Sequence, residues 1–147
     1  EEIDLFDSRD NIRFSYMGLD NATVMGPKPQ LTRVFVNLIN NAVQAIENAQ
    51  TEAEEKGLEP FTGRIVVSLR LSSKDGFYDI VFEDNGPGVS EENRSKLFTP
   101  NFTTKSNGTG LGLSICRNIL EKCNGEIFYS KSFSLKGACF TVRFPRR

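Results

Sequence analysis

The sequence predicts an α+β domain with two layers, in which a mixed, mostly antiparallel sheet is covered by helices on one face. Two segments carry apolar residues at helical spacing, and two pairs of strand-like segments are each joined by a tight turn. Strands paired by hairpins run antiparallel, and amphipathic helices must bury their apolar stripe against the sheet. The 147 residues suit one domain of ordinary size, so residues 1–147 are assigned to a single domain.

The first half of the chain predicts a strand, a long helix and a hairpin. The strand is expected over 12–16, where the residues are Ile-Arg-Phe-Ser-Tyr. After a Gly-Pro turn, a helix is expected from Gln30 to Ala49, because its apolar residues recur every three or four positions. Residues 50–63 are acidic and then broken by glycine and proline, which indicates a helix end and a loop. The hairpin consists of strands over 65–71 and 77–83.

The second half predicts a loop-rich segment, a helix and a second hairpin. Residues 84–110 are rich in glycine and proline, with a short helical piece near 91–97. A helix from about Gly110 to Lys122 is expected to end at Asn124-Gly125, a common signal for a helix C-terminus. The last strands are expected over 126–133 and 138–144, with a turn at 134–137.

The composition excludes several classes of catalyst and partner. The chain has no histidine, which excludes an internal Ser-His-Asp or Cys-His nucleophile system, an HExxH zinc site and a histidine general base. The formal net charge of −1 gives no general attraction to nucleic acid or to an anionic membrane, so neither is expected as a partner. Cys116, Cys123 and Cys139 have no metal or disulfide spacing and are interpreted as buried small hydrophobes in a reducing compartment.

The hydropathy and the first residues bear on membrane spans, on secretion and on whether the chain is a fragment. No apolar run approaches the ~20 residues of a membrane span, and no signal peptide opens the sequence. Because the chain begins Glu1-Glu2 without a methionine, we expect it to be a fragment of a longer protein.

The first candidate site lies within the long helix, at Asn37-Leu38-Ile39-Asn40-Asn41-Ala42-Val43-Gln44-Ala45. Asn37 and Asn41 are one helical turn apart on the same side, at the edge of the apolar stripe, where packing would favour Leu or Ala. Amide oxygens are suitable ligands for Mg²⁺, and amide NH₂ groups can donate to phosphate. The alternative is ordinary interhelical hydrogen bonding or simple exposure.

The second candidate site is Asp84-Asn85-Gly86-Pro87-Gly88-Val89, directly after a strand. Asp84 continues the alternation of Ile80 and Phe82, which predicts that its carboxylate points to the buried face. A buried carboxylate needs hydrogen-bond donors, and the exocyclic amine of adenine is one. The two glycines permit a close approach of the backbone. An ordinary turn is the alternative.

The third candidate site is Gly108-Thr109-Gly110-Leu111-Gly112-Leu113, at the start of the last helix. Glycines before a helix expose N–H groups to an anion, and the helix dipole adds to the attraction. The pattern matches neither the Walker signature nor the dinucleotide-binding signature. The preceding loop, Phe98-Thr99-Pro100-Asn101-Phe102-Thr103-Thr104-Lys105-Ser106-Asn107, has the hydroxyls, cation and glycine hinge that a nucleotide lid requires. A disordered surface loop is the alternative.

In this order the three segments resemble the GHKL superfamily of ATP-binding domains, and within it the catalytic domain of bacterial sensor histidine kinases. Residues 37–45 resemble the N box, 84–89 the G1 box, Phe98 and Phe102 the F box, and 108–115 the G2 box. The resemblance spans nearly the whole chain. It implies a Bergerat-type fold with a mobile ATP lid over about 89–108. Residues 101–105 are similar to the nitrogen-regulation branch of these kinases.

The resemblance also implies roles for individual residues. Asp84 would accept the adenine amine, and Asn41 would ligate the Mg²⁺ that bridges the phosphates. The catalytic residues implied are Asn37, Asn41 and Lys105, and the metal ligand is Asn41. The residues implied to bind ATP and Mg²⁺ are Asn37, Asn41, Gln44, Ala45, Asp84, Gly86, Gly88, Val89, Phe98, Phe102, Thr103, Thr104, Lys105, Gly108, Thr109, Gly110, Leu111, Gly112 and Leu113.

The sequence departs from the family pattern at three positions. ATP-hydrolysing relatives of the gyrase, Hsp90 and MutL types have a Glu four residues before the metal-binding Asn, whereas Asn37 stands here and cannot serve as a base. Gln44 stands where many sensor kinases have Lys or Arg, which removes one positive partner for the phosphates. Ala138 follows Gly137 where a hydroxyl is common, which questions a secondary contact to adenine.

The implied reaction is transfer of the γ-phosphoryl group of MgATP to a histidine on a separate dimerisation domain, which depends mainly on positioning and charge neutralisation. The implied partners are that domain and the receiver domain of a response regulator. The fragment is expected to be a cytoplasmic monomer that binds ATP without autokinase activity, cut from a homodimeric parent whose membrane anchoring the sequence leaves open. The alternatives are a GHKL ATPase of the gyrase, Hsp90 or MutL type and a degenerate nucleotide-binding module.

Overall fold

A mixed five-stranded sheet forms one layer of the protein. The structure is a computed structural model, and it describes residues 12–18, 28–99 and 112–145. Within these ranges the strands have the spatial order β1-β2-β3-β5-β4. β1 runs parallel to β2, and the other neighbouring pairs are antiparallel. The strands are β1 (Ile12–Met17), β2 (Gly63–Leu71), β3 (Phe77–Asp84), β4 (Glu126–Lys131) and β5 (Ala138–Pro145).

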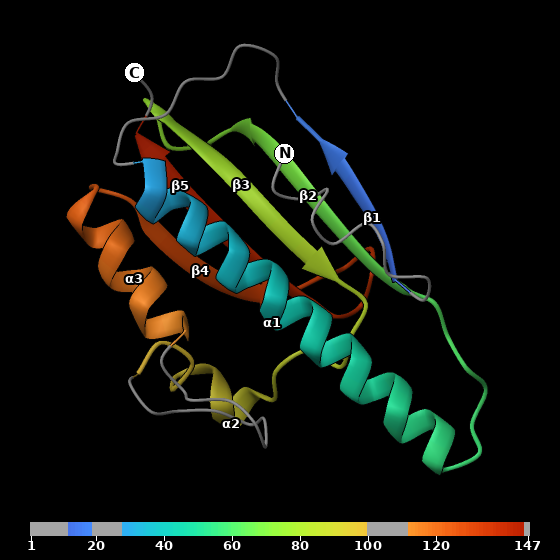
Figure 1. The fold of residues 1–147 in the computed structure, drawn as a ribbon. Coiled ribbons are helices and arrows are strands. Elements are labelled where there is room, and N and C mark those ends of the chain that lie inside the picture. Colours follow the sequence, from blue (N-terminus) through green and yellow to red (C-terminus); the bar gives the residue numbers. More distant parts are fainter. Residues whose placement is uncertain (1–11, 19–27, 100–111, 146–147) are drawn as a thin grey trace.

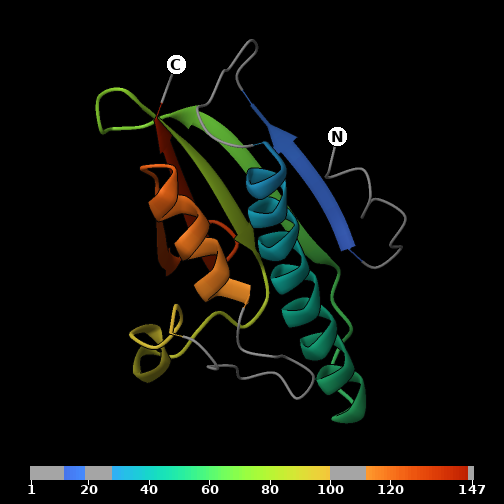
Figure 2. The same cartoon turned by 60° about the vertical axis from the view of Figure 1, so that its left-hand side comes forward.

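The helices form the second layer, on one face of this sheet. α1 (Lys28–Glu55) lies on one face of the sheet, and α3 (Gly112–Lys122) lies beside it on the same face (Figures 1 and 2). The short α2 (Glu91–Arg94) follows β3 at the end of the sheet. The predicted two-layer α+β sandwich, with helices on one face of a mixed sheet, is therefore confirmed.

The core lies between the two helices and the inner face of the sheet. One stripe of α1 is buried against alternate residues of β2, β3 and β5, and α3 closes the side of the core. Each large aliphatic or aromatic side chain buried in this way stabilises the fold by about 1.5–3 kcal/mol relative to its exposed state. The most buried large side chains include Val34, Leu38, Ile46, Ile65, Leu120, Val142 and Phe144.

Both long helices end in a hydrogen-bonded cap. α1 extends to Glu55, beyond the expected end at Ala49, because most of the added residues are good helix formers and Ala53 is buried. Gly57 then adopts a φ of 68°, and the Leu58 N–H donates to the Ala53 carbonyl at 2.8 Å. Positive φ with this bond closes a Schellman motif, for which glycine is the preferred residue.

α3 ends as its sequence predicts. Asn124 has a φ of 61°, and the Gly125 N–H donates to the Leu120 carbonyl at 2.7 Å. Cys123 lies in this turn, after the last residue of the helix. Cys116 is fully buried, whereas Cys123 and Cys139 are only partly buried.

Two predicted boundaries near the last hairpin and α2 also shift. β4 ends at Lys131 and not at 133, because the Ser132 N–H donates to the Gly137 carbonyl at 2.8 Å and closes the turn early. The helical piece expected near 91–97 is a single turn, Glu91–Arg94, followed by further turns up to Thr99. Leu97 at the end of this segment is buried in the core.

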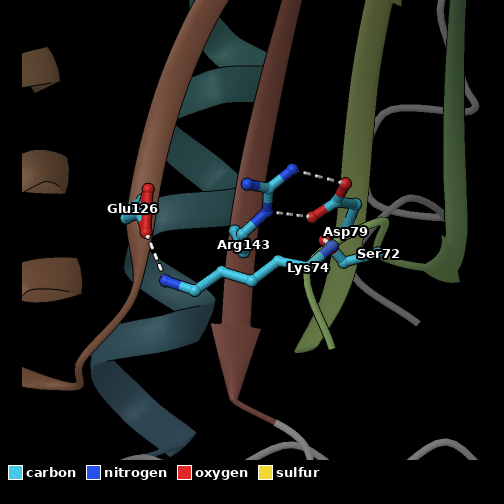
Figure 3. A network of polar contacts seen from close by, with 5 residues as sticks. All are labelled: Ser72, Lys74, Asp79, Glu126 and Arg143. Atoms are coloured by element: carbon cyan, nitrogen blue, oxygen red, sulfur yellow. Dashed lines mark hydrogen bonds and ion pairs between the residues drawn. The ribbon is translucent and has the colours of Figure 1, made fainter. Parts of the chain in front are cut away.

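Charged side chains form ion pairs on the outer face of the sheet, the face away from α1 (Figure 3). Asp79 on β3 and Arg143 on β5 are paired neighbours, joined by two hydrogen bonds of 2.8 and 3.1 Å. The bond to Asp79 raises the pKa of the Arg143 guanidinium. Lys74, in the β2–β3 turn, reaches across to Glu126 on β4 at 3.1 Å. These pairs tie three strands together on the face that the helices do not cover.

The Asp79–Arg143 pair is expected to contribute more to stability than an exposed ion pair. Asp79→Ala should lower the free energy of unfolding by about 2–3 kcal/mol, because the poorly exposed guanidinium of Arg143 loses a bidentate partner. Urea titration measures the loss. The control Glu121→Ala breaks the exposed pair with Arg117 and should change stability little. Equal losses in both variants would contradict this ranking.

Candidate functional site

Asp84 ends β3 with its carboxylate on the inner face of the sheet. Its side chain is buried, at 4% exposure, as are Ile80 and Phe82 on the same face, so the predicted inward alternation is confirmed. The Asp84 Oδ1 accepts hydrogen bonds from the Gly86 N–H at 2.9 Å and from the Ala138 N–H at 3.2 Å. A carboxylate offers about four lone-pair sites, and these bonds occupy two of them and orient the group.

Glycines allow the backbone to approach this carboxylate closely. A Cβ on Gly137 would overlap the Asp84 carbonyl oxygen and lie 2.6 Å from its Oδ1. A Cβ on Gly86 would lie 3.1 Å from the same Oδ1, and Gly88 has a φ of 75°. The predicted need for close backbone approach at Gly86 is thus met, while Gly137 is a neighbour of Asp84 that sequence reasoning did not identify.

Asn85 fastens the loop that follows Asp84 to the start of β2. Its Oδ1 accepts the Arg64 N–H at 2.7 Å, and its Nδ2 donates to the Thr62 carbonyl at 3.0 Å. The Asn85 N–H also donates to the Arg64 carbonyl at 3.2 Å. Asn85 therefore fixes the loop to β2, whereas the Asp84 carboxylate points to the inner face of the sheet.

One side of α1 connects this loop with α3. Asn37, Asn41 and Ala45 follow one another at four-residue steps, so they share one side of the helix. Ala45 is the neighbour of Gly86, since a Cβ on that glycine would lie 3.6 Å from the Ala45 Cβ. At the other end, the Asn37 Nδ2 donates to the Cys116 Sγ of α3 at 3.7 Å. Asn41 lies between these two contacts, and all three side chains are partly buried.

Gln44 stands apart from this row. Its side chain is exposed, one residue before Ala45. The structure therefore brings Asn37, Asn41 and Ala45 to one side of α1 and leaves Gln44 at the solvent.

Cys116 is a contact of the Asn37 amide as well as a core residue. Its thiol donates to the Val34 carbonyl at 3.9 Å and accepts from Asn37. Burial raises the pKa of the thiol from 9.0 to about 11. The sequence predicted the burial of this cysteine but carried no signal for the contact to Asn37, because the two residues lie 79 positions apart.

The first residues of the expected lid pack against β4 and β5. The Val89 N–H donates to the Tyr129 hydroxyl at 3.0 Å, and the Arg94 guanidinium lies over the Tyr129 ring, 5.5 Å from its centroid. The Phe98 ring meets the Phe140 ring edge-on, with centroids 6.4 Å apart. Tyr129 was not recognised in the sequence, and an alternating strand residue offers no signal for this role.

The remaining predicted site residues are only partly covered by the structure. Gly112 and Leu113 open α3, whose described part starts two residues after the expected Gly110. Leu113 packs on the core, and a Cβ on Gly112 would meet no atom of the described residues within 4 Å. The other predicted site residues lie outside the described residues, and their roles stay predictions. They are Phe102, Thr103, Thr104, Lys105, Gly108, Thr109, Gly110 and Leu111.

The described part of the chain contains neither a cluster of metal-binding side chains nor a helix that could span a membrane. In the ranges 12–18, 28–99 and 112–145, no three His, Cys, Asp or Glu side chains gather in a way that could hold a metal ion. No helix in those ranges is long and apolar enough to cross a membrane.

Comparison with known families places the chain. Residues 26–147 match the family described as histidine kinase-, DNA gyrase B- and HSP90-like ATPase, so the chain belongs to that family. The sensor histidine kinase ZraS of Salmonella typhimurium is 38% identical over 119 residues, which are 79% of this chain and 22% of that protein. Sporulation kinase A of Bacillus subtilis is 32% identical over 136 residues, 92% of this chain and 20% of that protein. The chain spans about a fifth of these relatives.

Solved structures agree with this assignment. The catalytic domain of the histidine kinase ThkA has a TM-score of 0.77 and 27% identity, over 98% of this chain and 85% of that one. The mycobacterial sensor histidine kinase MprB has a TM-score of 0.79 at 23% identity, over 99% and 91% of the two chains, and shows the shared fold. The resemblance to sensor-kinase catalytic domains is confirmed, and the nitrogen-regulation branch stays a prediction.

The buried thiol of Cys116 predicts a loss of stability in alkaline solution. Below pH 9 the thiol is protonated in both states, whereas between pH 9 and about 11 only the unfolded chain releases the proton. Unfolding therefore becomes easier as pH rises, by up to about 3 kcal/mol for two pKa units.

Cys116→Val should remove this component, so that its stability falls less steeply between pH 9 and 11 than that of the wild type. Urea titrations at a series of pH values measure the slope. The control Cys123→Ala leaves the buried thiol in place and should keep the wild-type slope. Parallel curves for the wild type and Cys116→Val would refute the prediction.

Proposed function

We propose that this chain binds MgATP and donates its γ-phosphoryl group to a histidine on a separate dimerisation domain. The observation that carries the proposal is the buried carboxylate of Asp84, which two backbone N–H groups orient. Membership of a family of ATPases and similarity to sensor histidine kinases support the same function.

Asp84 would recognise the adenine base. An ionised carboxylate only accepts hydrogen bonds, and the exocyclic amine of adenine only donates them. Guanine presents a carbonyl oxygen at the equivalent position, which a carboxylate repels. Ala45 and Gly86 lie in contact beside Asp84, and Val89 packs on the core nearby, so apolar groups would line the base pocket.

The amides of α1 would hold the metal and the phosphates. Asn41 lies on the same side of the helix as Ala45, one turn from the Gly86 contact. Its side-chain oxygen is a suitable ligand for Mg²⁺, which when bound neutralises charge on the phosphates. Asn37, held by Cys116, would support this arrangement from the next turn. Thr104 and Lys105, on the expected lid over about 89–108, would meet the terminal phosphates.

The residue types favour transfer to a protein group over transfer to water. Asn37 stands one turn before Asn41, where it cannot act as a base because an amide takes no proton at neutral pH. The chain has no histidine, so the acceptor must come from another segment or domain. The parent would be a homodimeric sensor kinase that passes the phosphoryl group on to the receiver domain of a response regulator.

Calorimetric titration with MgATP, followed by an assay for phosphate release, tests the function. Binding with negligible hydrolysis is the expected result. Rapid hydrolysis would favour an ATPase of the gyrase, Hsp90 or MutL type, and no binding would favour a degenerate module. Addition of a dimerisation domain that carries a histidine, taken from a similar kinase, should yield phosphohistidine.

Asp84→Asn should remove the preference for adenine nucleotides. The amide presents a donor as well as an acceptor, so ATP affinity should fall at least tenfold, equivalent to about 1.4 kcal/mol, and the discrimination against GTP should disappear. Calorimetry with both nucleotides measures this. The control Asp75→Asn lies in the β2–β3 turn and should bind as the wild type does. Unchanged ATP affinity in Asp84→Asn would exclude the adenine role.

Asn41→Ala should remove the dependence of ATP binding on Mg²⁺. The wild type should bind ATP more tightly in Mg²⁺ than in EDTA, whereas the variant should bind equally in both, because the metal loses its protein ligand. Asn48→Ala, an exposed asparagine of the same helix, is the control. A preserved Mg²⁺ effect in Asn41→Ala would contradict the assignment of the metal ligand.

A further inference from the structure

Two adjacent carboxylates at the end of β3 reach the same turn from opposite faces of the sheet. Asp84 lies on the inner face, where it accepts the Ala138 N–H at the end of the β4–β5 turn. Glu83 lies on the outer face, where its Oε2 accepts the Ser132 hydroxyl at 2.7 Å and the Ser134 hydroxyl at 3.3 Å. The turn is therefore held at its beginning by Glu83 and at its end by Asp84.

Ser132 is the centre of this turn. It is 1% exposed, and its Oγ accepts the Leu135 N–H at 3.1 Å while donating to Glu83. Its backbone bonds the far side of the turn, since the Ser132 N–H donates to the Gly137 carbonyl at 2.8 Å and the Lys136 N–H donates to the Ser132 carbonyl at 2.9 Å. A residue that makes three hydrogen bonds within the turn and a fourth to Glu83 determines where the following strand begins.

The start of that strand controls the surroundings of Asp84. Gly137 is so close to Asp84 that any side chain would overlap it, and Ala138 supplies one of the two N–H groups that orient Oδ1. If the turn shifts, the Ala138 N–H leaves the carboxylate, which loses one of the hydrogen bonds that orient it. A carboxylate held by fewer hydrogen bonds is less firmly oriented, so it discriminates less well between a donor and an acceptor on a base.

We infer that Glu83 and Ser132 are positioning residues for base selection. They act through the β4–β5 turn on Asp84 and touch no nucleotide themselves. The inference rests on the proposed role of Asp84 in recognising adenine. By this inference, contacts on the outer face of the sheet influence which base is bound. Neither Glu83 nor Ser132 belongs to a recognised motif.

The test compares Glu83→Ala and Ser132→Ala with the conservative Glu83→Gln. The ratio of GTP to ATP dissociation constants is measured by calorimetry. Both alanine variants should reduce this ratio about fivefold or more. Glu83→Gln should keep it near the wild-type value, because the amide oxygen still accepts the Ser132 hydroxyl. Glu126→Ala, which removes a carboxylate from the outer face of β4, is the matched control.

The second readout is the amide proton shift of Ala138 in the nucleotide-free protein. Loss of a charge-assisted hydrogen bond should move this resonance upfield in Glu83→Ala and Ser132→Ala, while the Gly86 resonance stays in place. The inference would be overturned if the alanine variants kept both the wild-type ratio of GTP to ATP dissociation constants and the wild-type Ala138 shift. A parallel loss of ATP and GTP affinity at constant ratio, which a purely structural role predicts, would overturn it as well.

Failure of the proposed function has a different signature. If the wild-type chain bound neither nucleotide, the proposed function would fail. The Ala138 resonance would still report whether Glu83 and Ser132 position the turn against Asp84. An Ala138 shift that responds only to Asp84→Asn, and not to Glu83→Ala, would overturn the positioning role in either case.

Discussion

The interaction on which the rest of the site depends is the pair of hydrogen bonds from Gly86 and Ala138 to the Asp84 carboxylate. A buried carboxylate is costly unless donors compensate for the lost water. Here the donors are backbone groups of two separate segments, so both must approach the same oxygen. That requirement explains why Gly137 has room for no side chain, and why the β4–β5 turn is bonded so fully within itself. A site built in this way is oriented before any ligand arrives.

α1 has the second organising role, because one side of it joins the loop after β3 to α3. Ala45 meets Gly86, and Asn37 meets Cys116, so this side of the helix runs from the loop after β3 to α3. The adjoining stripe of the same helix is apolar and is buried against the sheet. On the outer face of the sheet, the Asp79–Arg143 pair adds two side-chain hydrogen bonds to the backbone pairing of β3 and β5.

Features with a local signal were predicted well. The periodicity of α1, the glycine turn between β2 and β3, and Asn124-Gly125 after α3 each depend on residues that are neighbours along the chain. The boundaries that shifted depend on bonds between residues further apart, such as the one that ends β4 at Lys131. The predicted burial of Asp84 was correct because strand alternation is also a local property.

Local patterns in the amino-acid chain therefore determined the order of elements, the family and most of the candidate residues. The folded protein decided which partners these residues have. Ala138 is 54 positions from Asp84, Ser132 is 49 from Glu83, and Cys116 is 79 from Asn37. Helical and strand patterns arise from neighbouring residues, whereas these hydrogen bonds exist only because packing of α1, α3 and the sheet brings distant segments into contact. The orientation of Asp84 is thus a property of the tertiary structure.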